Sequence, residues 1–264
     1  MQYIDYDNEL NERQLEAVRT SFQYVRVVAG AGSGKTRVLT YRIAYLIDQQ
    51  HVEPWKILAI TFTNKVANEM KNRVLRMIPE AGKDLKIKTF HSFAAFFLRS
   101  EISVLDFPTN FNILDEEDQT KLIKDIISDH GYKRNDPIFS RVFNYISLCK
   151  SKEKYPEDVK LGDHRIEGEK ELLEIYQEYE DRKNIQYSLD FDDLLLYTNI
   201  ILENHLEIRL KWQRKFDHIL IDEFQDTNDI EYRMVKFLLK PYSSLYVVGD
   251  PDQTISTWRG ANQK

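Results

Sequence analysis

Apolar residues form short, nearly continuous runs, each followed by a polar or glycine-rich segment. These runs cover residues 25–28, 57–62, 218–221 and 244–250, and a shorter mixed run lies at 87–89. Such runs are typical of strands buried on both faces of a parallel sheet. After the run at 57–62 the apolar positions follow a helical period, at Val66, Met70, Val74 and Ile78. The pattern therefore predicts an α/β fold, a parallel sheet flanked by helices.

The alternation of strands and helices stops at residues 107–110. From about 115 to about 212 the periodicity is only helical, with helices expected at 116–130, 137–150, 169–183 and 191–203. Residues 150–154 and 161–163 are the expected loops of this region. We therefore expect a core formed by residues 1–108 and 213–264, interrupted by an all-helical subdomain at 109–212.

The turn after the first run reads Ala-Gly-Ala-Gly-Ser-Gly-Lys-Thr, and an amphipathic helix is expected at 37–47. Glycines let the backbone curl so that successive N–H groups point at an anion, and the helix N-terminus adds a positive dipole end. This is the pattern of a phosphate-binding loop, in which the lysine reaches the β- and γ-phosphates and the threonine coordinates Mg²⁺. One methyl group at the loop entrance, where the pattern has glycine, should be tolerated. The expected nucleotide-binding residues of the loop are Ala29, Gly30, Ala31, Gly32, Ser33, Gly34, Lys35 and Thr36.

Two adjacent carboxylates, Asp222 and Glu223, follow the run at 218–221. Two charges at the end of a buried strand are costly without a counter-charge, and Mg²⁺ would supply one. We expect Asp222 to hold the ion and Glu223 to polarise the water that attacks the γ-phosphate. Gln253, just beyond the last run, is placed to sense the γ-phosphate. The catalytic candidates are therefore Lys35, Asp222, Glu223 and Gln253, and the metal-binding candidates are Thr36 and Asp222.

Some polar positions allow both a structural and a functional interpretation. Gln14 stands three residues after Asn11 and can close a helix capping box, or its amide can pair with the edge of an adenine. The acidic residues at 190–193 stand near an expected helix start, where capping and the helix dipole explain some of them. A metal site there fits the composition, but no histidine or recognised ligand spacing supports it.

Composition narrows the class of protein. The 264 residues are 42% hydrophobic and 30% charged, which suffices for a substantial core. The net charge of −6 argues against a uniformly basic nucleic-acid binder, but residues 65–99 carry eight basic and three acidic side chains, a local charge of +5. Such a stripe can follow a phosphate backbone, or it can be a solvated helix face.

Other classes are excluded by what the chain lacks. The single cysteine, Cys149, excludes an internal disulfide framework and a cysteine-rich zinc site. No run approaches the roughly 20 apolar residues that cross a bilayer, and the first residues do not form a signal peptide. We therefore expect a cytoplasmic protein without a membrane partner.

A series of short motifs occurs in a characteristic order. The motifs are Leu-Asn-Glu-Arg-Gln at 10–14, the phosphate-binding loop, Thr-Phe-Thr-Asn-Lys at 61–65, Thr-Phe-His-Ser at 89–92, Asp-Phe-Asp-Asp-Leu at 190–194, Asp-Glu-Phe-Gln-Asp-Thr at 222–227 and Val-Gly-Asp-Pro-Asp-Gln-Thr-Ile-Ser-Thr-Trp-Arg-Gly-Ala at 248–261. This set resembles superfamily 1 DNA helicases of the UvrD/Rep/PcrA type, over essentially the whole chain.

The resemblance implies a RecA-like P-loop core with an inserted helical subdomain, ATP and Mg²⁺ as cofactors, and ATP-driven movement on single-stranded DNA, 3′ to 5′ in the relatives. It also implies that Gln14 contacts adenine and that Arg37 lies near the nucleotide. The implied single-strand path is lined by Phe62, Thr63, Asn64, His91 and Trp258, and Arg259 is placed to touch a phosphate. Stacking on Trp258 would contribute about 1 to 3 kcal/mol per base. From the residues alone, His91 is equally well explained as a core histidine.

In this family a second RecA-like core supplies arginine fingers, and nothing in this chain resembles it. We therefore expect the chain to be the N-terminal portion of a longer helicase that acts on single-stranded DNA, or on duplex with a single-stranded tail, in repair, replication or recombination. Because an arginine finger is worth about 10³-fold or more in rate, we expect the chain alone to bind ATP weakly, hydrolyse it poorly and not unwind DNA.

Three alternatives remain open from the sequence. The same core occurs in helicase–nuclease subunits and phage-defence ATPases. A non-catalytic, nucleotide-dependent DNA-binding module is opposed by the intact Lys35, Thr36, Asp222 and Glu223. A P-loop small-molecule kinase is opposed by the basic stripe and the Trp258-Arg259 pair. The oligomeric state does not follow from the sequence.

Overall fold

The computed structural model describes residues 4–30, 32–82, 84–162 and 166–250. The chain forms two compact units, of which one comprises Met1–Phe93 and Leu202–Lys264 and the other Ala94–Ile201. The division falls inside α5 (Phe90–Glu101) and α9 (Phe191–Asn204), whereas boundaries at 108/109 and 212/213 were expected from the sequence. A division inside a helix interrupts no periodicity, so the hydrophobic pattern gives no sign of it.

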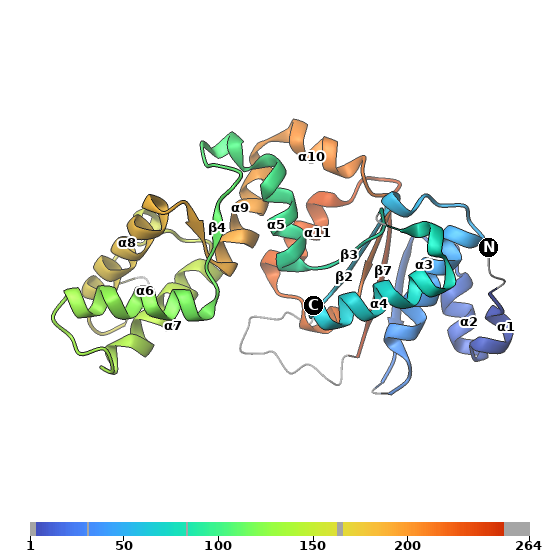
Figure 1. Cartoon of the computed structure of the whole chain (residues 1–264), viewed down its shortest axis with the longest axis horizontal. Coiled ribbons are helices and arrows are strands. Elements are labelled where there is room, and N and C mark those ends of the chain that lie inside the picture. The colour runs from blue at the N-terminus through green and yellow to red at the C-terminus, as the bar shows by residue number, and fades with distance from the viewer. Residues whose placement is uncertain (1–3, 31, 83, 163–165, 251–264) are drawn as a thin grey trace. The chain divides into compact units, whose positions relative to one another are not determined.

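The first unit is built on one parallel sheet (Figure 1). Its strands are β1 (Tyr24–Val28), β2 (Ile57–Thr61), β3 (Lys86–Thr89), β6 (His218–Ile221) and β7 (Ser244–Gly249), in the spatial order β1-β7-β6-β2-β3. Val28 lies opposite Gly249 and Ile221 lies opposite Val247, so these strands end at the same edge. The predicted α/β fold with a parallel sheet is confirmed.

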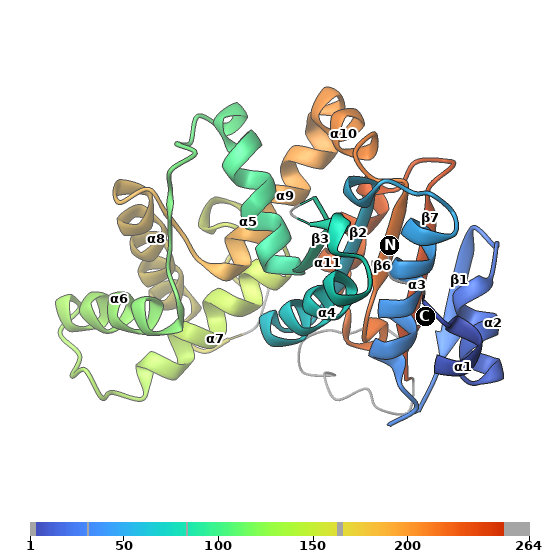
Figure 2. The same cartoon turned by 45° about the vertical axis from the view of Figure 1, so that its right-hand side comes forward.

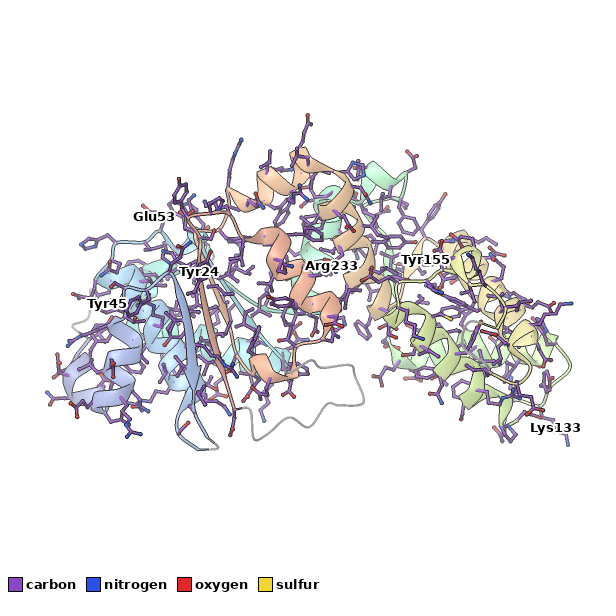
Figure 3. All side chains as sticks on the ribbon, turned by 180° about the vertical axis from the view of Figure 1, so that it is seen from behind. Tyr24, Tyr45, Glu53, Lys133, Tyr155 and Arg233 are labelled. Carbon is purple, nitrogen blue, oxygen red and sulfur yellow. The ribbon has the colours of Figure 1, made fainter. Side chains whose placement is uncertain are left out.

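Helices cover both faces of this sheet. Figure 2 shows α3 and α4 on one face, and Figure 3, seen from behind relative to Figure 1, shows α11 with its labelled Arg233 on the other. Every residue of β2 is buried, as its apolar run predicts. The helical segments of the unit besides α5 and α9 are α1 (Tyr6–Glu9), α2 (Glu12–Arg19), α3 (Lys35–Asp48), η1 (Pro54–Lys56), α4 (Asn64–Met77), η2 (Pro79–Ala81), α10 (Leu206–Gln213), η5 (Phe224–Asp226) and α11 (Asp229–Leu238). Helix α10 was not expected from the sequence.

The edge strand β1 is only half covered. Its residues alternate between exposed and half-buried. Tyr24, labelled in Figure 3, and Val28 are each 61% exposed, whereas Val25 and Val27 pack against the core. The strand that leads into the phosphate-binding loop is therefore fixed from one face and through its pairing with β7.

The second unit is mainly helical. Its segments besides α5 and α9 are η3 (Ile102–Leu105), β4 (Asn112–Ile113), α6 (Glu116–Asp129), α7 (Ile138–Ser151), η4 (Pro156–Asp158), α8 (Glu169–Ile185) and β5 (Ser188–Leu189). The predicted helices are present within one or two residues at each end. The expectation of an all-helical region is wrong in one detail, because β4 and β5 pair in parallel. A ladder of two residues is too short to produce a hydrophobic period.

Helices α7, α8 and α9 meet at a buried ionic cluster. Lys150 and Lys183 are both 1% exposed, and their ammonium groups contact the carboxylates of Glu180, Asp190 and Asp193. Lys150 Nζ lies 2.6 Å from both Asp190 Oδ2 and Asp193 Oδ1. Lys150, expected at the start of a loop, is therefore a buried residue in the last turn of α7.

The cluster also bears on the metal site considered at residues 190–193. Oxygens of Glu180, Asp190 and Asp193 lie within 4.8 Å of one another, a spacing that a cation could use. Burial alone would raise the pKa of Asp190, but the charges of Lys150 and Lys183 outweigh burial and hold that pKa below its usual range. The lysines thus supply the positive charge that a metal would otherwise provide.

None of the helices within the described ranges is long and apolar enough to cross a membrane.

Candidate active site

The phosphate-binding loop connects β1 to α3 at the carboxyl edge of the sheet. Gly32 and Gly34 have φ values of 71° and 86°, the left-handed region that glycine adopts without strain. The Ala29 N–H donates to the Gly249 carbonyl at 3.1 Å, and the Ser33 hydroxyl donates to the Gly30 carbonyl at 2.6 Å. The loop is therefore curled and tied to the end of β7. Ala31 lies outside the described residues.

Four predicted catalytic and metal-binding side chains meet beside this loop. Lys35 Nζ lies 3.4 Å from Glu223 Oε2. The Thr36 hydroxyl donates to Asp222 Oδ2 at 3.3 Å. Segments 186 residues apart in sequence are thus joined, because β6 ends next to the start of α3. The structure brings together Lys35, Thr36, Asp222 and Glu223.

The carboxyl of Asp222 has an unusual environment. The residue is 3% exposed. Burial raises the pKa of Asp222 to about 6, and the neighbouring charge of Glu223 adds to that effect, while hydrogen bonds from the Glu223 N–H and Thr36 oppose it. A buried carboxylate of this kind is stabilised in its charged form by a cation. A hydroxyl and a carboxylate are also the hard oxygen ligands that Mg²⁺ prefers, so the residues present fit a magnesium ion.

Gln14 makes both a structural contact and a contact to the loop. Its backbone N–H donates to Asn11 Oδ1 at 2.9 Å and its Oε1 accepts from the Asn11 N–H at 3.2 Å, which confirms the predicted capping box of α2. Its Nε2 donates to the Ser33 carbonyl at 3.0 Å. A Cβ atom at Gly34 would lie 2.9 Å from that nitrogen. The capping role therefore does not exclude a role at the nucleotide, because the same amide reaches the phosphate-binding loop.

Arg37, expected near the nucleotide, is engaged with the N-terminal segment. Its Nη2 donates to the Glu9 carbonyl at 2.6 Å, and the guanidinium lies over the Tyr41 ring at 5.2 Å. These contacts give Arg37 a packing role between α1 and α3.

Four of the predicted DNA-contacting residues lie along the same edge of the sheet. Phe62 and the exposed Thr63 and Asn64 follow β2, and the half-buried His91 is the second residue of α5, directly after β3. The Thr63 hydroxyl accepts from the Val66 N–H at 3.2 Å and caps α4. Thr61 and Thr89 lie opposite one another in the sheet, so these segments leave neighbouring strands at the same level. Gln253, Trp258 and Arg259 lie outside the described residues.

One side chain at the site was not predicted. Gln225 donates from Nε2 to Glu223 Oε2 at 2.7 Å and accepts at Oε1 from the Asp250 N–H at 3.0 Å. It belongs to the motif at 222–227, but a motif does not indicate which strand end a side chain reaches. The only sequence signal was its position two residues after Glu223.

The amino-acid sequence is similar to those of known helicases. The sequence profile of the UvrD/REP helicase N-terminal domain matches residues 10–264. The chain is 42% identical over 258 residues to the probable DNA helicase II homolog of Mycoplasma capricolum subsp. capricolum, covering 96% of this chain and 35% of that protein. It is 42% identical over 258 residues to the ATP-dependent DNA helicase PcrA of Bacillus subtilis, covering 96% of this chain and 34% of that protein.

A third relative is similar over nearly the whole of this chain. The chain is 40% identical over 258 residues to the ATP-dependent DNA helicase PcrA of Staphylococcus aureus strain COL, covering 97% of this chain and 35% of that protein. The chain thus spans about a third of the length of the curated relatives it matches. Because the profile covers nearly the whole chain, this protein belongs to the UvrD/REP helicase family through its N-terminal, RecA-like P-loop domain.

Proposed function

We propose that this chain is the ATP-binding and single-stranded-DNA-binding part of an ATP-dependent DNA helicase. The observation that carries the proposal is the meeting of Lys35 and Thr36 with Asp222 and Glu223 at one edge of the sheet. A phosphate-binding loop facing a buried carboxylate and a second acidic side chain is the arrangement that hydrolysis of a nucleoside triphosphate requires.

The proposed roles follow from the chemistry of each side chain. Lys35 places a positive charge where phosphate oxygens would bind. Its present contact with Glu223 would then be lost, which leaves the Glu223 carboxylate available to the attacking water. Thr36 and Asp222 would hold Mg²⁺, which when bound neutralises charge on the phosphates. Glu223 would orient and polarise the water as a general base. The adenine contact of Gln14 belongs to the same proposal.

DNA binding is assigned to the neighbouring part of the edge. Phe62, Thr63, Asn64 and His91 offer aromatic and hydrogen-bonding groups beyond β2 and β3, and Trp258 and Arg259 are assigned to the same path from the sequence. We further propose 3′ to 5′ movement along the DNA. We also propose a second RecA-like core that completes the nucleotide site, since the helicases matched by this chain are about three times its length. On this view turnover by the 264-residue chain is slow.

The test combines ATP hydrolysis with DNA binding. Single-turnover hydrolysis of radiolabelled ATP by excess protein is measured with and without a single-stranded oligonucleotide, together with fluorescence anisotropy of that oligonucleotide. Glu223→Gln should lower the hydrolysis rate by roughly a hundredfold or more while Mg²⁺-ATP still binds, since general-base catalysis is worth about that much.

The matched control is Glu207→Gln, the same change at an exposed position in α10, which should hydrolyse ATP like the parent chain. Equal rates for Glu223→Gln and the parent would contradict the catalytic assignment. An oligonucleotide that neither binds nor alters turnover would instead favour a P-loop enzyme acting on a small molecule.

A further inference from the structure

Gln225 lies between the proposed catalytic base and the end of β7. Its Nε2 lies 2.7 Å from Glu223 Oε2 and 3.4 Å from Asp226 Oδ2, and its Oε1 lies 3.0 Å from the Asp250 backbone nitrogen. The orientation of the amide is determined by chemistry, because carboxylates only accept and a backbone N–H only donates. A reversed amide would lose all three hydrogen bonds.

The backbone of β7 approaches this amide too closely for any side chain. A Cβ atom at Gly249 would lie 2.5 Å from Gln225 Oε1 and 3.4 Å from the backbone nitrogens of Phe224 and Gln225. The Gly249 carbonyl in turn accepts from Ala29 at the start of the phosphate-binding loop. A continuous set of contacts therefore runs from the loop through Gly249 and Gln225 to Glu223.

Glu223 needs such support because its backbone is strained. Its φ is 50°, in the left-handed region, which is energetically unfavourable for a residue that is not glycine. The carboxylate is only partly buried, so packing alone does not hold it. The hydrogen bond from Gln225 and the contact with Lys35 are the described interactions that orient it.

We propose that Gln225 is a positioning residue that holds the Glu223 carboxylate in its catalytic orientation and ties that orientation to the end of β7. The proposal rests on the proposed function of Glu223. A bound γ-phosphate would attract Lys35 and so remove its contact with the Glu223 carboxylate. The hydrogen bond from Gln225 would then maintain the orientation of that carboxylate. Because Gln225 also accepts from the Asp250 N–H, the orientation of the Glu223 carboxylate depends on the position of Asp250. In the sequence, Asp250 begins the motif segment that contains Gln253 and Trp258.

The first test is a double-mutant cycle under single-turnover conditions with saturating Mg²⁺-ATP. Gln225→Ala should lower the hydrolysis rate by roughly ten- to a hundredfold, the usual cost of a misplaced catalytic group, with mant-ATP affinity unchanged. In the Glu223→Gln background the same change should have no further effect, because Gln225 acts through Glu223. Gln177→Ala, at an exposed position on α8, is the matched control and should hydrolyse ATP like the parent.

The outcomes separate the two proposals. Hydrolysis that does not depend on Glu223 overturns the proposed function. Hydrolysis that depends on Glu223 but is unchanged by Gln225→Ala overturns the positioning role. An additive loss in the double variant also overturns it, because a merely structural defect would add to the loss of the base.

The second test adds hydrogen exchange to the hydrolysis measurement and distinguishes the contact of the Gln225 nitrogen from that of its oxygen. Gln225→Glu keeps an oxygen that can accept from the Asp250 N–H but loses the donor to Glu223. Hydrogen exchange of the Asp250 amide should therefore speed up in Gln225→Ala and stay near the parent rate in Gln225→Glu, while hydrolysis falls in both. Gly249→Ala should resemble Gln225→Ala in both readouts, since its Cβ would displace the amide. Unchanged exchange in Gln225→Ala would show that the link to β7 does not exist.

Discussion

Single residues at this site serve more than one contact at a time. The Gln14 amide uses its oxygen for the α2 cap and its nitrogen for the Ser33 carbonyl. Gln225 uses its nitrogen for Glu223 and its oxygen for β7. An amide carries a donor and an acceptor at a fixed separation, so it can connect two backbone segments that an acid or a hydroxyl would not connect in the same way.

The two contacts of Gln14 can be separated by one substitution. Gln14→Glu keeps an acceptor for the Asn11 N–H, so the thermal midpoint of unfolding should stay close to that of the parent. It loses the donor to Ser33 and places a negative charge beside the phosphate-binding loop, so mant-ATP should bind at least about tenfold more weakly, a change of about 1.4 kcal/mol. Nucleotide titration and thermal unfolding measure the two effects.

Asn11→Ala is the complementary variant. It removes the cap and should destabilise the fold by about 1 kcal/mol, with a smaller effect on nucleotide affinity than Gln14→Glu. A Gln14→Glu protein that binds mant-ATP as tightly as the parent would show that this amide has no part in nucleotide binding.

At the scale of elements, the second unit depends on charge pairing inside its core. Lys150 on α7 and Lys183 on α8 meet carboxylates from α8 and from the start of α9. Tyr179 adds a hydrogen bond from its hydroxyl to Asp190 Oδ2 at 2.8 Å. Buried charges are costly unless they are paired, so loss of one partner should destabilise the packing of these helices.

Removing one ammonium group should therefore be costly. Lys150→Met leaves three buried carboxylates facing the single ammonium group of Lys183, and should lower the free energy of unfolding by about 3 to 5 kcal/mol. Lys152→Met, the same change at an exposed position two residues later, should have little effect. Urea unfolding followed by circular dichroism measures both variants. Similar midpoints for the two would mean that the cluster contributes little to stability.

The pairing of β6 with β7 should make stability depend on pH. His218 begins β6, and its Nδ1 lies 2.6 Å from Ser244 Oγ. Burial lowers its pKa, the charges of Arg42 and Lys240 lower it further, and Asp217 opposes them. The unfolded chain therefore binds a proton near pH 6.5 that the folded chain does not yet bind.

The folded protein should lose stability as the pH falls. The contribution of His218 is fully present above about pH 6.5 and is lost as the pH falls below that value, because protonation then favours unfolding. His218→Gln should reduce the fall in unfolding free energy between about pH 7 and pH 5. Urea titrations at several pH values check this, and parallel curves for the parent and the variant would contradict it.

At the scale of the whole molecule, charge is unevenly distributed. The net charge is −6, yet residues 65–99 are locally basic. Burial lowers the pKa of Lys88, and the charges of Lys86 on β3 and Lys71 on α4 lower it further. A locally basic stretch can neutralise phosphates, so we propose that these residues contact DNA.

DNA binding should therefore depend steeply on salt. Anisotropy titrations with a single-stranded oligonucleotide should give a linear decrease of log K with log salt concentration. If Lys71 contacts a phosphate, Lys71→Ala should reduce the slope by roughly 0.7. Lys121→Ala on α6 is the matched control. Equal slopes for the parent and Lys71→Ala would assign Lys71 to a solvated helix face.

Much of the architecture and of the nucleotide site could be predicted from the sequence. The strands, the phosphate-binding loop and the capping box of Gln14 depend on local periodicity or on residues close in the chain. The pairing of Thr36 with Asp222 could be expected because carboxyl ends of parallel strands share one edge. The position of Gln225 could not, because it depends on how closely β7 approaches the segment after β6.

Features that depend on neighbouring residues can be predicted from the sequence, whereas features that depend on distant residues cannot. The α/β class, the phosphate-binding loop and the acidic pair follow from the amino-acid order alone, since backbone conformation and strand burial depend on residues that are close together in the chain. The folded structure was needed to show that Lys150 is buried among carboxylates rather than in a loop. It was also needed to show that Gln225 joins Glu223 to Gly249 and Asp250. Burial of a charge and the direction of an amide depend on partners distant in sequence, and such partners are specified only when the chain is folded.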